Sequence, residues 1–121
     1  MALPPEPIDT VLVDAKVVVV GFVDAILETG PELPQRQAKK GERDLGNKAP
    51  WQRVRLTVER TLRGEAGKTV EAFKPEGAYI VATGTRGAFL LGAPEGGSAP
   101  ILGRYGPDTW REDVVVAAFA R

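Results

Sequence analysis

The sequence contains no cysteine and no histidine, and it has one serine, Ser98. Without cysteine the chain forms no disulfide and offers no thiol nucleophile or thiolate metal ligand. Without histidine it lacks the most common general base and the most common metal ligand, so Ser-His-Asp and Cys-His catalytic arrangements are excluded. The sequence therefore predicts a protein that is not an enzyme and that binds no cofactor and no metal ion.

Nucleotide-binding glycine patterns are also missing, although the chain has 14 glycines. Neither G-x-G-x-x-G nor G-x-x-x-x-G-K-[ST] occurs, so the glycines are interpreted as turn and bend residues. Glu112 and Asp113 are adjacent acids that helix capping explains better than metal binding. Asp24 and Glu28 lie four residues apart, and a calcium site there is kept only as an alternative.

Long hydrophobic runs are absent. The longest apolar run, residues 17–20 followed by 21–23, is too short to span a bilayer. Residues 1–5 show neither the basic nor the apolar region of a signal peptide. We therefore expect no membrane span. The protein is expected to be exported (periplasmic or extracellular) if a leader has been removed, and cytoplasmic otherwise. The sequence leaves the oligomeric state open.

The composition is that of a small globular domain. The 121 residues, 43% of them hydrophobic, suffice for one domain with a single core. The formal net charge is zero, but residues 1–34 contain six acids and one base, whereas residues 35–63 contain nine bases and three acids. We interpret the basic stretch as a solvated loop followed by a charged strand face. A basic patch for an anionic partner is the alternative.

Two segments give the clearest β signals. Residues 51–63 alternate apolar and charged side chains, which predicts a strand with one buried face and one charged face. The apolar, β-branched run at 15–26 predicts a central strand that is either buried on both sides or changes face midway, with a bulge or bend at Gly21. Shorter strands are expected at 69–73, 88–91 and 101–104.

Helical spacing occurs near both ends of the chain. Apolar residues at helical spacing follow Pro7, which predicts a short helix at 8–15 after an extended segment at 1–7. Thr109 and Glu112 match a capping box, and an apolar stripe follows them. The sequence therefore predicts a C-terminal helix at about 110–120.

A long polar segment, residues 28–50, separates the two clearest strands. Glycine, proline and charged residues dominate it, and it shows no periodicity. Loops of this length in a compact domain are typically functional or disordered. The strongest local charge signal of the chain is its basic cluster, formed by Arg36, Lys39, Lys40, Arg43 and Lys48.

The order of these segments resembles the netrin-like (NTR) module, the OB-type barrel also found in tissue inhibitors of metalloproteinases. A short helix precedes A-x-V-V-V-V-G-x-V at 15–23, a long insertion follows, and V-R-L-T-V-E-R-T-L-R-G at 54–64 ends in a turn. T-V-E-A-F at 69–73 and G-T-R-G-A-F-L-L-G at 84–92 complete the pattern. The resemblance covers about residues 8–119.

The resemblance implies a mostly β fold, a five-stranded Greek-key barrel of the OB type, with the C-terminal helix packed across it. It also implies a module that binds other proteins, often outside the cell. The chain lacks the cysteines that staple the animal modules and the N-terminal cysteine that chelates the protease zinc. Protease inhibition is therefore not expected. The cysteine-free pattern is similar to bacterial relatives, which are frequently exported.

A single domain is thus expected at residues 8–121, with a long loop at 28–50. Its core is predicted to contain the apolar residues of the expected strands and of the C-terminal helix: Val17, Val19, Val54, Leu56, Val58, Val70, Phe89, Leu90 and Phe119.

Two functions are consistent with these features. The first is non-catalytic protein binding through the 28–50 loop and the exposed strand face at Arg53, Arg55 and Thr57. The alternative is binding of single-stranded nucleic acid by a basic groove with stacking aromatics, for which Trp51 and Tyr105 are expected to be free. The candidate binding residues are Arg36, Lys39, Lys40, Arg43, Trp51, Arg53 and Arg55.

Overall fold

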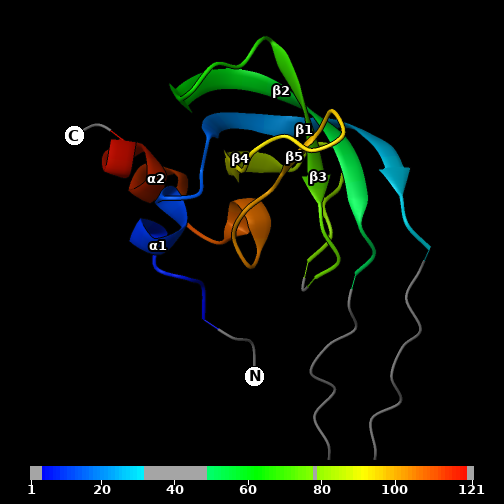
Figure 1. Cartoon of the computed structure of the whole chain (residues 1–121), viewed down its shortest axis with the longest axis horizontal. Coiled ribbons are helices and arrows are strands. Elements are labelled where there is room, and N and C mark those ends of the chain that lie inside the picture. Colours follow the sequence, from blue (N-terminus) through cyan, green and yellow to red (C-terminus); the bar gives the residue numbers. More distant parts are fainter. Residues whose placement is uncertain (1–3, 32–48, 78, 120–121) are drawn as a thin grey trace, which may run out of the picture.

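Five strands form one mixed sheet in the computed structural model, which describes residues 4–31, 49–77 and 79–119 (Figure 1). The order across the sheet is β4-β1-β2-β3-β5. All neighbouring strands are antiparallel except β3 and β5, which are parallel. The strands are β1 (Val17–Thr29), β2 (Gln52–Arg63), β3 (Thr69–Lys74), β4 (Arg86–Leu91) and β5 (Ala99–Pro100).

The sheet is not closed into a barrel, contrary to the prediction from the sequence. β5 contains two residues, too few to form a ladder with both β3 and β4. An isolated bridge links Leu91, the last residue of β4, to Ile101, the residue just after β5. Ile101 N–H donates to the carbonyl of Phe73 on β3, and Leu102 N–H donates to the carbonyl of Leu90 on β4. The chain just after β5 therefore connects the sheet edges at one point, and the last strand expected at 101–104 is replaced by this bridge.

The first half of β1 is buried on both faces, as the apolar run predicted. Val19 and Val23 enter the cluster inside the curved sheet, whereas Val18 and Val20 enter a second cluster beneath the helices. The register against β2 shifts between Val20 and Gly21, which confirms the predicted irregularity at the glycine. This bend allows one strand to pair with β4 over its first half and with β2 along its whole length.

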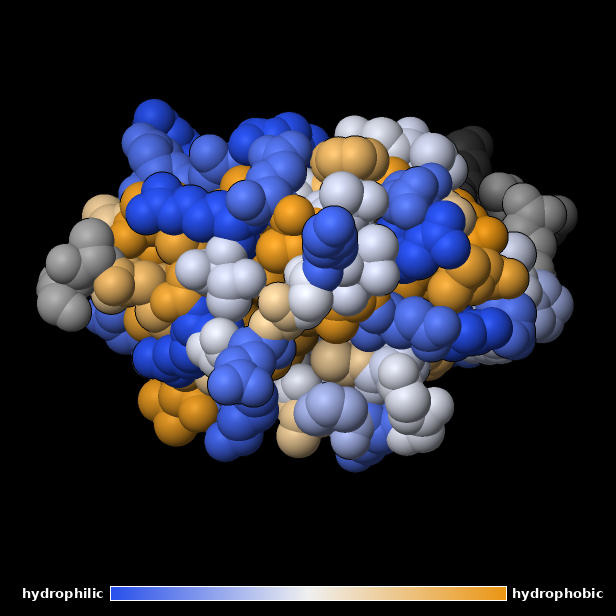
Figure 2. Space-filling model, turned by 90° about the horizontal axis from the view of Figure 1, so that it is seen from above, coloured by the Kyte–Doolittle hydropathy of each residue, from blue (hydrophilic) through white to orange (hydrophobic). Residues whose placement is uncertain are grey.

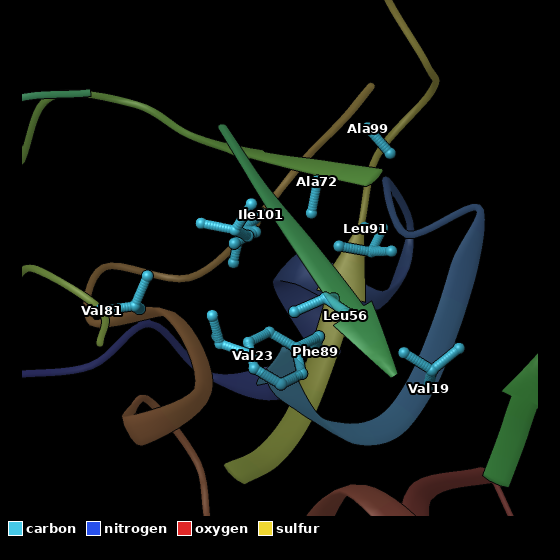
Figure 3. Close-up of a cluster of buried hydrophobic side chains, with 10 residues drawn as sticks. Val19, Val23, Leu56, Ala72, Val81, Phe89, Leu91, Ala99 and Ile101 are labelled. Atoms are coloured by element: carbon cyan, nitrogen blue, oxygen red, sulfur yellow. The ribbon is translucent and has the colours of Figure 1, made fainter. Parts of the chain in front are cut away.

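The inner cluster fills the concave side of the sheet (Figure 3). Every labelled side chain of Figure 3 is buried. Apart from Val81 and Ile101, the labelled residues come from all five strands. Five of the nine predicted core residues are fully buried: Val19, Val54, Leu56, Phe89 and Leu90. The other four are half-buried and pack against the two clusters: Val17, Val58, Val70 and Phe119.

Two short helices cover the outer face of β1 and β4 at one side of the sheet (Figure 1). They are α1 (Ile8–Leu12) and α2 (Glu112–Phe119), and a 3-10 helix η1 (Gly106–Asp108) precedes α2. The predicted capping box is wrong, because α2 begins at Glu112 rather than after Thr109. Thr109 instead ends η1, and its Oγ1 accepts a hydrogen bond from Tyr105 N–H at 2.9 Å.

The predicted loop boundary also needs correction. β1 runs to Thr29, so Glu28 and Thr29 are strand residues paired with Arg53 and Gln52. Most of the expected loop, residues 32–48, lies outside the described residues. None of the helices in the described ranges has the length and apolar character needed to cross a membrane.

Candidate interaction face

The outward side chains of β1, β2 and β3 form one polar surface, which we call the charged face: Asp24, Glu28, Arg53, Arg55, Thr57 and Glu71. On β2 the alternation places Arg53, Arg55 and Thr57 opposite the buried residues Val54 and Leu56. The register places Arg55 across from Glu71 on β3, and Arg53 across from Glu28 on β1. Residues directly opposite on antiparallel strands share a face, so charges distant in sequence meet here.

Both arginines of the charged face are paired with carboxylates. Arg53 donates from Nη2 to Glu28 Oε1 at 2.6 Å and from Nη1 to Glu71 Oε2 at 3.3 Å. Arg55 Nε donates to Asp24 Oδ2 at 2.8 Å. The hydrogen bond to Glu28 raises the pKa of the Arg53 guanidinium above its ordinary value. With two cations and three anions, the face has a formal charge of about −1 and no excess of positive charge.

An aromatic pair lies at one end of the charged face. The rings of Trp51 and Phe73 are stacked, with centroids 5.8 Å apart and planes inclined by 27°. Phe73 on β3 lies directly opposite Arg53 on β2, so the Trp51–Phe73 pair lies next to Arg53 on the charged face. A side chain at Gly30 would lie 2.5 Å from Trp51 Nε1, which shows that the indole rests directly on the Gly30 backbone. Both rings are half-buried, and each therefore keeps some exposed surface.

The structure brings together three of the seven predicted binding residues. Arg53 and Arg55 lie side by side on β2, and Trp51 precedes that strand beside Phe73. Trp51 is not free to stack as predicted, because Phe73 already occupies one side of its ring. The other four predicted binding residues lie outside the described part of the chain: Arg36, Lys39, Lys40 and Arg43.

Sequence reasoning missed the acids that neutralise the arginines. Asp24 and Glu28 had been singled out only as an alternative calcium site. In the structure one oxygen of each accepts a hydrogen bond from an arginine, which leaves them less suited to a cation. Among the described residues no group of three or more acids is close enough to hold a metal ion. The available signal was the acidic first strand followed by a basic second strand, which antiparallel pairing brings into contact.

Two buried polar side chains support the face from beneath. Gln52 is 3% exposed, and its amide bonds both backbone groups of Val81. Nε2 donates to the Val81 carbonyl at 3.0 Å, and Oε1 accepts from Val81 N–H at 2.9 Å. The Gln52 side chain thus makes the two hydrogen bonds with the Val81 backbone that a neighbouring strand would otherwise make. Val81 belongs to the segment that connects β3 and β4. Sequence alternation alone had not indicated a polar residue on the buried side.

Lys74 is the second buried polar residue, and its side chain is fully inaccessible. Its Nζ donates to the carbonyl of Pro50 at 2.6 Å and lies 5.2 Å from the ring centroid of Tyr79. Burial lowers the pKa of Lys74, and Glu76 offsets part of the effect. Burial also raises the pKa of Tyr79, whose hydroxyl is buried without a hydrogen-bond partner in the described structure. Lys74 thus ties the end of β3 to the chain preceding β2.

The lowered pKa of Lys74 predicts that alkaline pH stabilises the fold. Between the lowered pKa and the ordinary lysine value, the unfolded chain holds a proton that the folded chain has lost. The free energy of unfolding then rises with pH, by at most about 1.4 kcal/mol per pH unit for one proton. Tyr79 opposes this above about pH 10, where the unfolded chain releases its proton first.

Urea unfolding at several pH values between about 8 and 10 measures the effect. The matched variant is Lys74→Met, which keeps the length of the side chain and removes its charge. We expect the wild type to gain stability relative to this variant as the pH rises. A difference between the two proteins that does not change with pH contradicts the prediction.

A second polar cluster connects the sheet to α2. Arg86 on β4 lies between Glu59 of β2 and Glu112 of α2, with N–O distances of 2.7 Å to each. It spans β1 and holds α2 against the outer face of the sheet. Because Arg86 is engaged on both sides, we assign this cluster a structural role.

Comparisons with protein-family models, with curated proteins and with solved structures find no match to this chain.

Proposed function

We propose that this protein is a non-catalytic protein-interaction module whose binding surface is the charged face together with the Trp51–Phe73 pair and the adjoining 28–50 segment. The observation that carries the proposal is the combination of an accessible aromatic pair with arginines already neutralised by neighbouring acids. Tryptophan and arginine are the side chains that most often dominate the binding energy of protein interfaces. Exposed polar groups of both signs then set the orientation of a partner.

The pairing of the arginines favours a protein partner over a nucleic acid. Binding to a phosphate backbone depends on cations that are free to replace its counterions. On the charged face both Arg53 and Arg55 would first have to leave Glu28, Glu71 or Asp24. The excess of acids would also repel a polyanion. Single-stranded nucleic acid binding is therefore the competing interpretation that the experiment must exclude.

The strand arrangement supports an OB-type interpretation of the fold. The order β4-β1-β2-β3-β5, with β3 and β5 parallel, is consistent with the strand order of an OB-type fold in a sheet that stays open apart from the bridge between Leu91 and Ile101. On this interpretation most of the charged face lies on the second and third strands, the surface that OB-type domains commonly use for ligands, and Asp24 and Glu28 extend it onto the first strand. We propose the netrin-like module as the family of this kind that the chain resembles.

Charge reversal on the face tests the proposal. The variant Arg53→Glu/Arg55→Glu places five acids together, and Arg111→Glu is the matched control because Arg111 is exposed on a different surface. Proteins retained by each immobilised variant are compared by mass spectrometry, after melting curves confirm that all are folded. We expect at least one protein to be retained by the wild type and by the control, and to be depleted tenfold or more by the face variant.

A salt titration with fluorescent single-stranded DNA and RNA addresses the competing interpretation. We expect no binding at low salt. Tight binding that weakens steeply with salt and that the face variant loses would replace the proposal with nucleic-acid binding. Identical sets of retained proteins for all variants would remove the charged face as a protein-binding surface.

A further inference from the structure

The chain just before α1, residues 4–7, lies across the loop that links β5 to α2, and we call it the N-terminal strap. Three hydrogen bonds hold the strap on this loop. Arg104 Nη1 donates to the carbonyl of Pro4, and Trp110 Nε1 donates to the carbonyl of Glu6 at 2.7 Å. The backbone N–H of Arg104 donates to Glu6 Oε1 at 2.9 Å. These contacts join segments that are about 100 positions apart in the sequence.

Proline gives the strap an extended conformation. Pro4, Pro5 and Pro7 fix φ at about −65°, and a residue that precedes proline, such as Glu6, is restricted to extended backbone. Pro7 has φ −58° and ψ 133°, which are values of a polyproline II helix. Such a helix has no internal hydrogen bonds, and proline has no N–H. The strap therefore offers carbonyl acceptors and very few backbone donors.

The groups that contact the strap are all hydrogen-bond donors. The indole of Trp110 and the guanidinium of Arg104 donate and have no acceptor, and the third contact is a backbone N–H. This set of donors matches a proline-rich segment, whereas an ordinary peptide brings N–H groups that these contacts leave unsatisfied. Aromatic-lined surfaces are also the usual binding sites of polyproline II segments. The chemistry on both sides therefore fits recognition of proline-rich chain.

The loop itself positions Arg104 and Trp110. Gly103 has φ 98°, and a Cβ there would lie 3.1 Å from Cζ3 of the Trp110 ring, so this ring rests against the Gly103 backbone. Thr109 Oγ1 accepts from Tyr105 N–H and closes the turn between the two donor side chains. The Trp110 ring also packs against the cluster beneath the helices. These contacts hold the donors in place without using the strap.

The strap rests on the surface of the protein. Its three prolines are exposed, and α1, which follows it, contains no buried residue. A segment with so few buried contacts detaches at a low cost in free energy. Its covalent attachment nevertheless gives it a high effective concentration at the site. A free segment of the same chemistry must therefore compete with the strap.

We propose that Arg104 and Trp110 form a recognition site for proline-rich segments, which the strap occupies within its own chain. The partner is a protein with an extended segment that resembles residues 4–7, in which prolines flank an acid. Two of its carbonyls would accept from the two side chains, and its carboxylate would accept from the Arg104 N–H. Binding of the partner would displace the strap.

This site is separate from the charged face. In Figure 1 the segment before α1 lies below the sheet, whereas β2 lies at the top of the view. Figure 2 views the molecule from the β2 side, where hydrophilic residues are spread over the surface with smaller hydrophobic areas between them. None of the residues of the proposed site belongs to the charged face, so the inference does not rest on the proposed function.

Fluorescence anisotropy with the whole chain and a labelled peptide that copies residues 2–8 tests the inference. The variant Pro4→Gly/Pro5→Gly keeps the strap carbonyls and makes the strap less rigid. We expect it to bind the peptide at least about fivefold more tightly than the wild type, because the site is free of the strap more of the time. A peptide with alanine in place of its three prolines is expected to bind at least about tenfold more weakly.

Two further substitutions, made in the glycine variant, locate the binding. Trp110→Phe keeps an aromatic ring and removes the indole N–H, and Arg104→Met removes the guanidinium. Arg60→Met is the matched control, because Arg60 is exposed on β2. After melting curves confirm that all variants are folded, we expect each site substitution to weaken peptide binding about fivefold or more, and the control to leave it unchanged.

The outcomes separate this inference from its alternatives. Absence of peptide binding to the glycine variant would mean that the strap is a fixed part of the fold. Equal binding of the alanine peptide, or unchanged affinity after both site substitutions, would also overturn the inference. A wild-type dimer that the peptide dissociates would show that a second copy supplies the segment. The variant Arg53→Glu/Arg55→Glu is expected to bind the peptide as the wild type does, so failure of the charged face and failure of this site are distinguishable.

Discussion

Replacing Gly21 by alanine is expected to lower the free energy of unfolding by about 3 kcal/mol. A Cβ at this position would lie 2.1 Å from the carbonyl oxygen of Thr57, which is backbone of the neighbouring strand. Relief requires β1 and β2 to separate at the bend that joins the two halves of the sheet. The small entropic advantage of alanine over glycine, about 0.4–1 kcal/mol, does not compensate for this displacement.

The matched control is Gly67→Ala in the turn between β2 and β3. A Cβ there would meet its nearest atom, the carbonyl oxygen of Thr69, at 3.8 Å, which is ordinary contact. The control is expected to be neutral or more stable by up to about 1 kcal/mol. Urea unfolding followed by tryptophan fluorescence measures both variants. Equal stabilities for the two would show that the close approach of β1 and β2 at Gly21 is wrong.

Replacing Gln52 by leucine is expected to cost about 2–4 kcal/mol, although it adds apolar volume to the interior. The N–H and carbonyl of Val81 would lose their partners, and both groups lie in a buried region. Each buried backbone group without a partner costs about 1–3 kcal/mol, which exceeds the gain from a larger apolar side chain. The segment between β3 and β4 should therefore detach first.

The variant Gln52→Glu distinguishes the contributions of the two hydrogen bonds between Gln52 and Val81. Its carboxylate can still accept from Val81 N–H but cannot donate to the Val81 carbonyl, and it places a charge in the interior. We expect it to destabilise the fold at least as much as leucine does. Thr69→Leu serves as a surface control, because Thr69 is exposed on β3, and it is expected to change stability by less than about 0.5 kcal/mol. Amide exchange at Val81 should rise in both Gln52 variants and stay unchanged in the control.

Periodicity predicted the individual strands well. The alternation at 51–63 and the β-branched run at 15–26 correspond to β2 and β1, because side-chain burial on a strand repeats every two residues whatever its neighbours are. The ends of elements were less predictable. α2 begins three residues after Thr109, since that hydroxyl bonds Tyr105 N–H within the preceding turn rather than capping the helix. The sheet stays open because β5 has only two residues, and no local sequence pattern reveals the length of that strand.

The candidate binding residues on β2 were predicted from the sequence, but their ion pairs were not. The distribution of acids and bases along the chain suggested a basic patch as one interpretation. The tertiary structure places Glu28 against Arg53 and Asp24 against Arg55, residues that are 25 and 31 positions apart. Attraction between charges depends on their distance in space, and strand register sets that distance. Among the described residues, Arg60 and Lys68 have no ion-pair partner.

The sequence by itself determined that cysteine and histidine chemistry is absent, and it determined which side chains share a face on the two long strands. Residue identity and local alternation are properties of the chain. The tertiary structure alone decided which charges are neutralised and why Gln52 and Lys74 are buried. Each of these depends on contacts between distant segments, such as Gln52 with Val81 and Lys74 with Pro50. The buried donors and acceptors find their partners only when the sheet has formed.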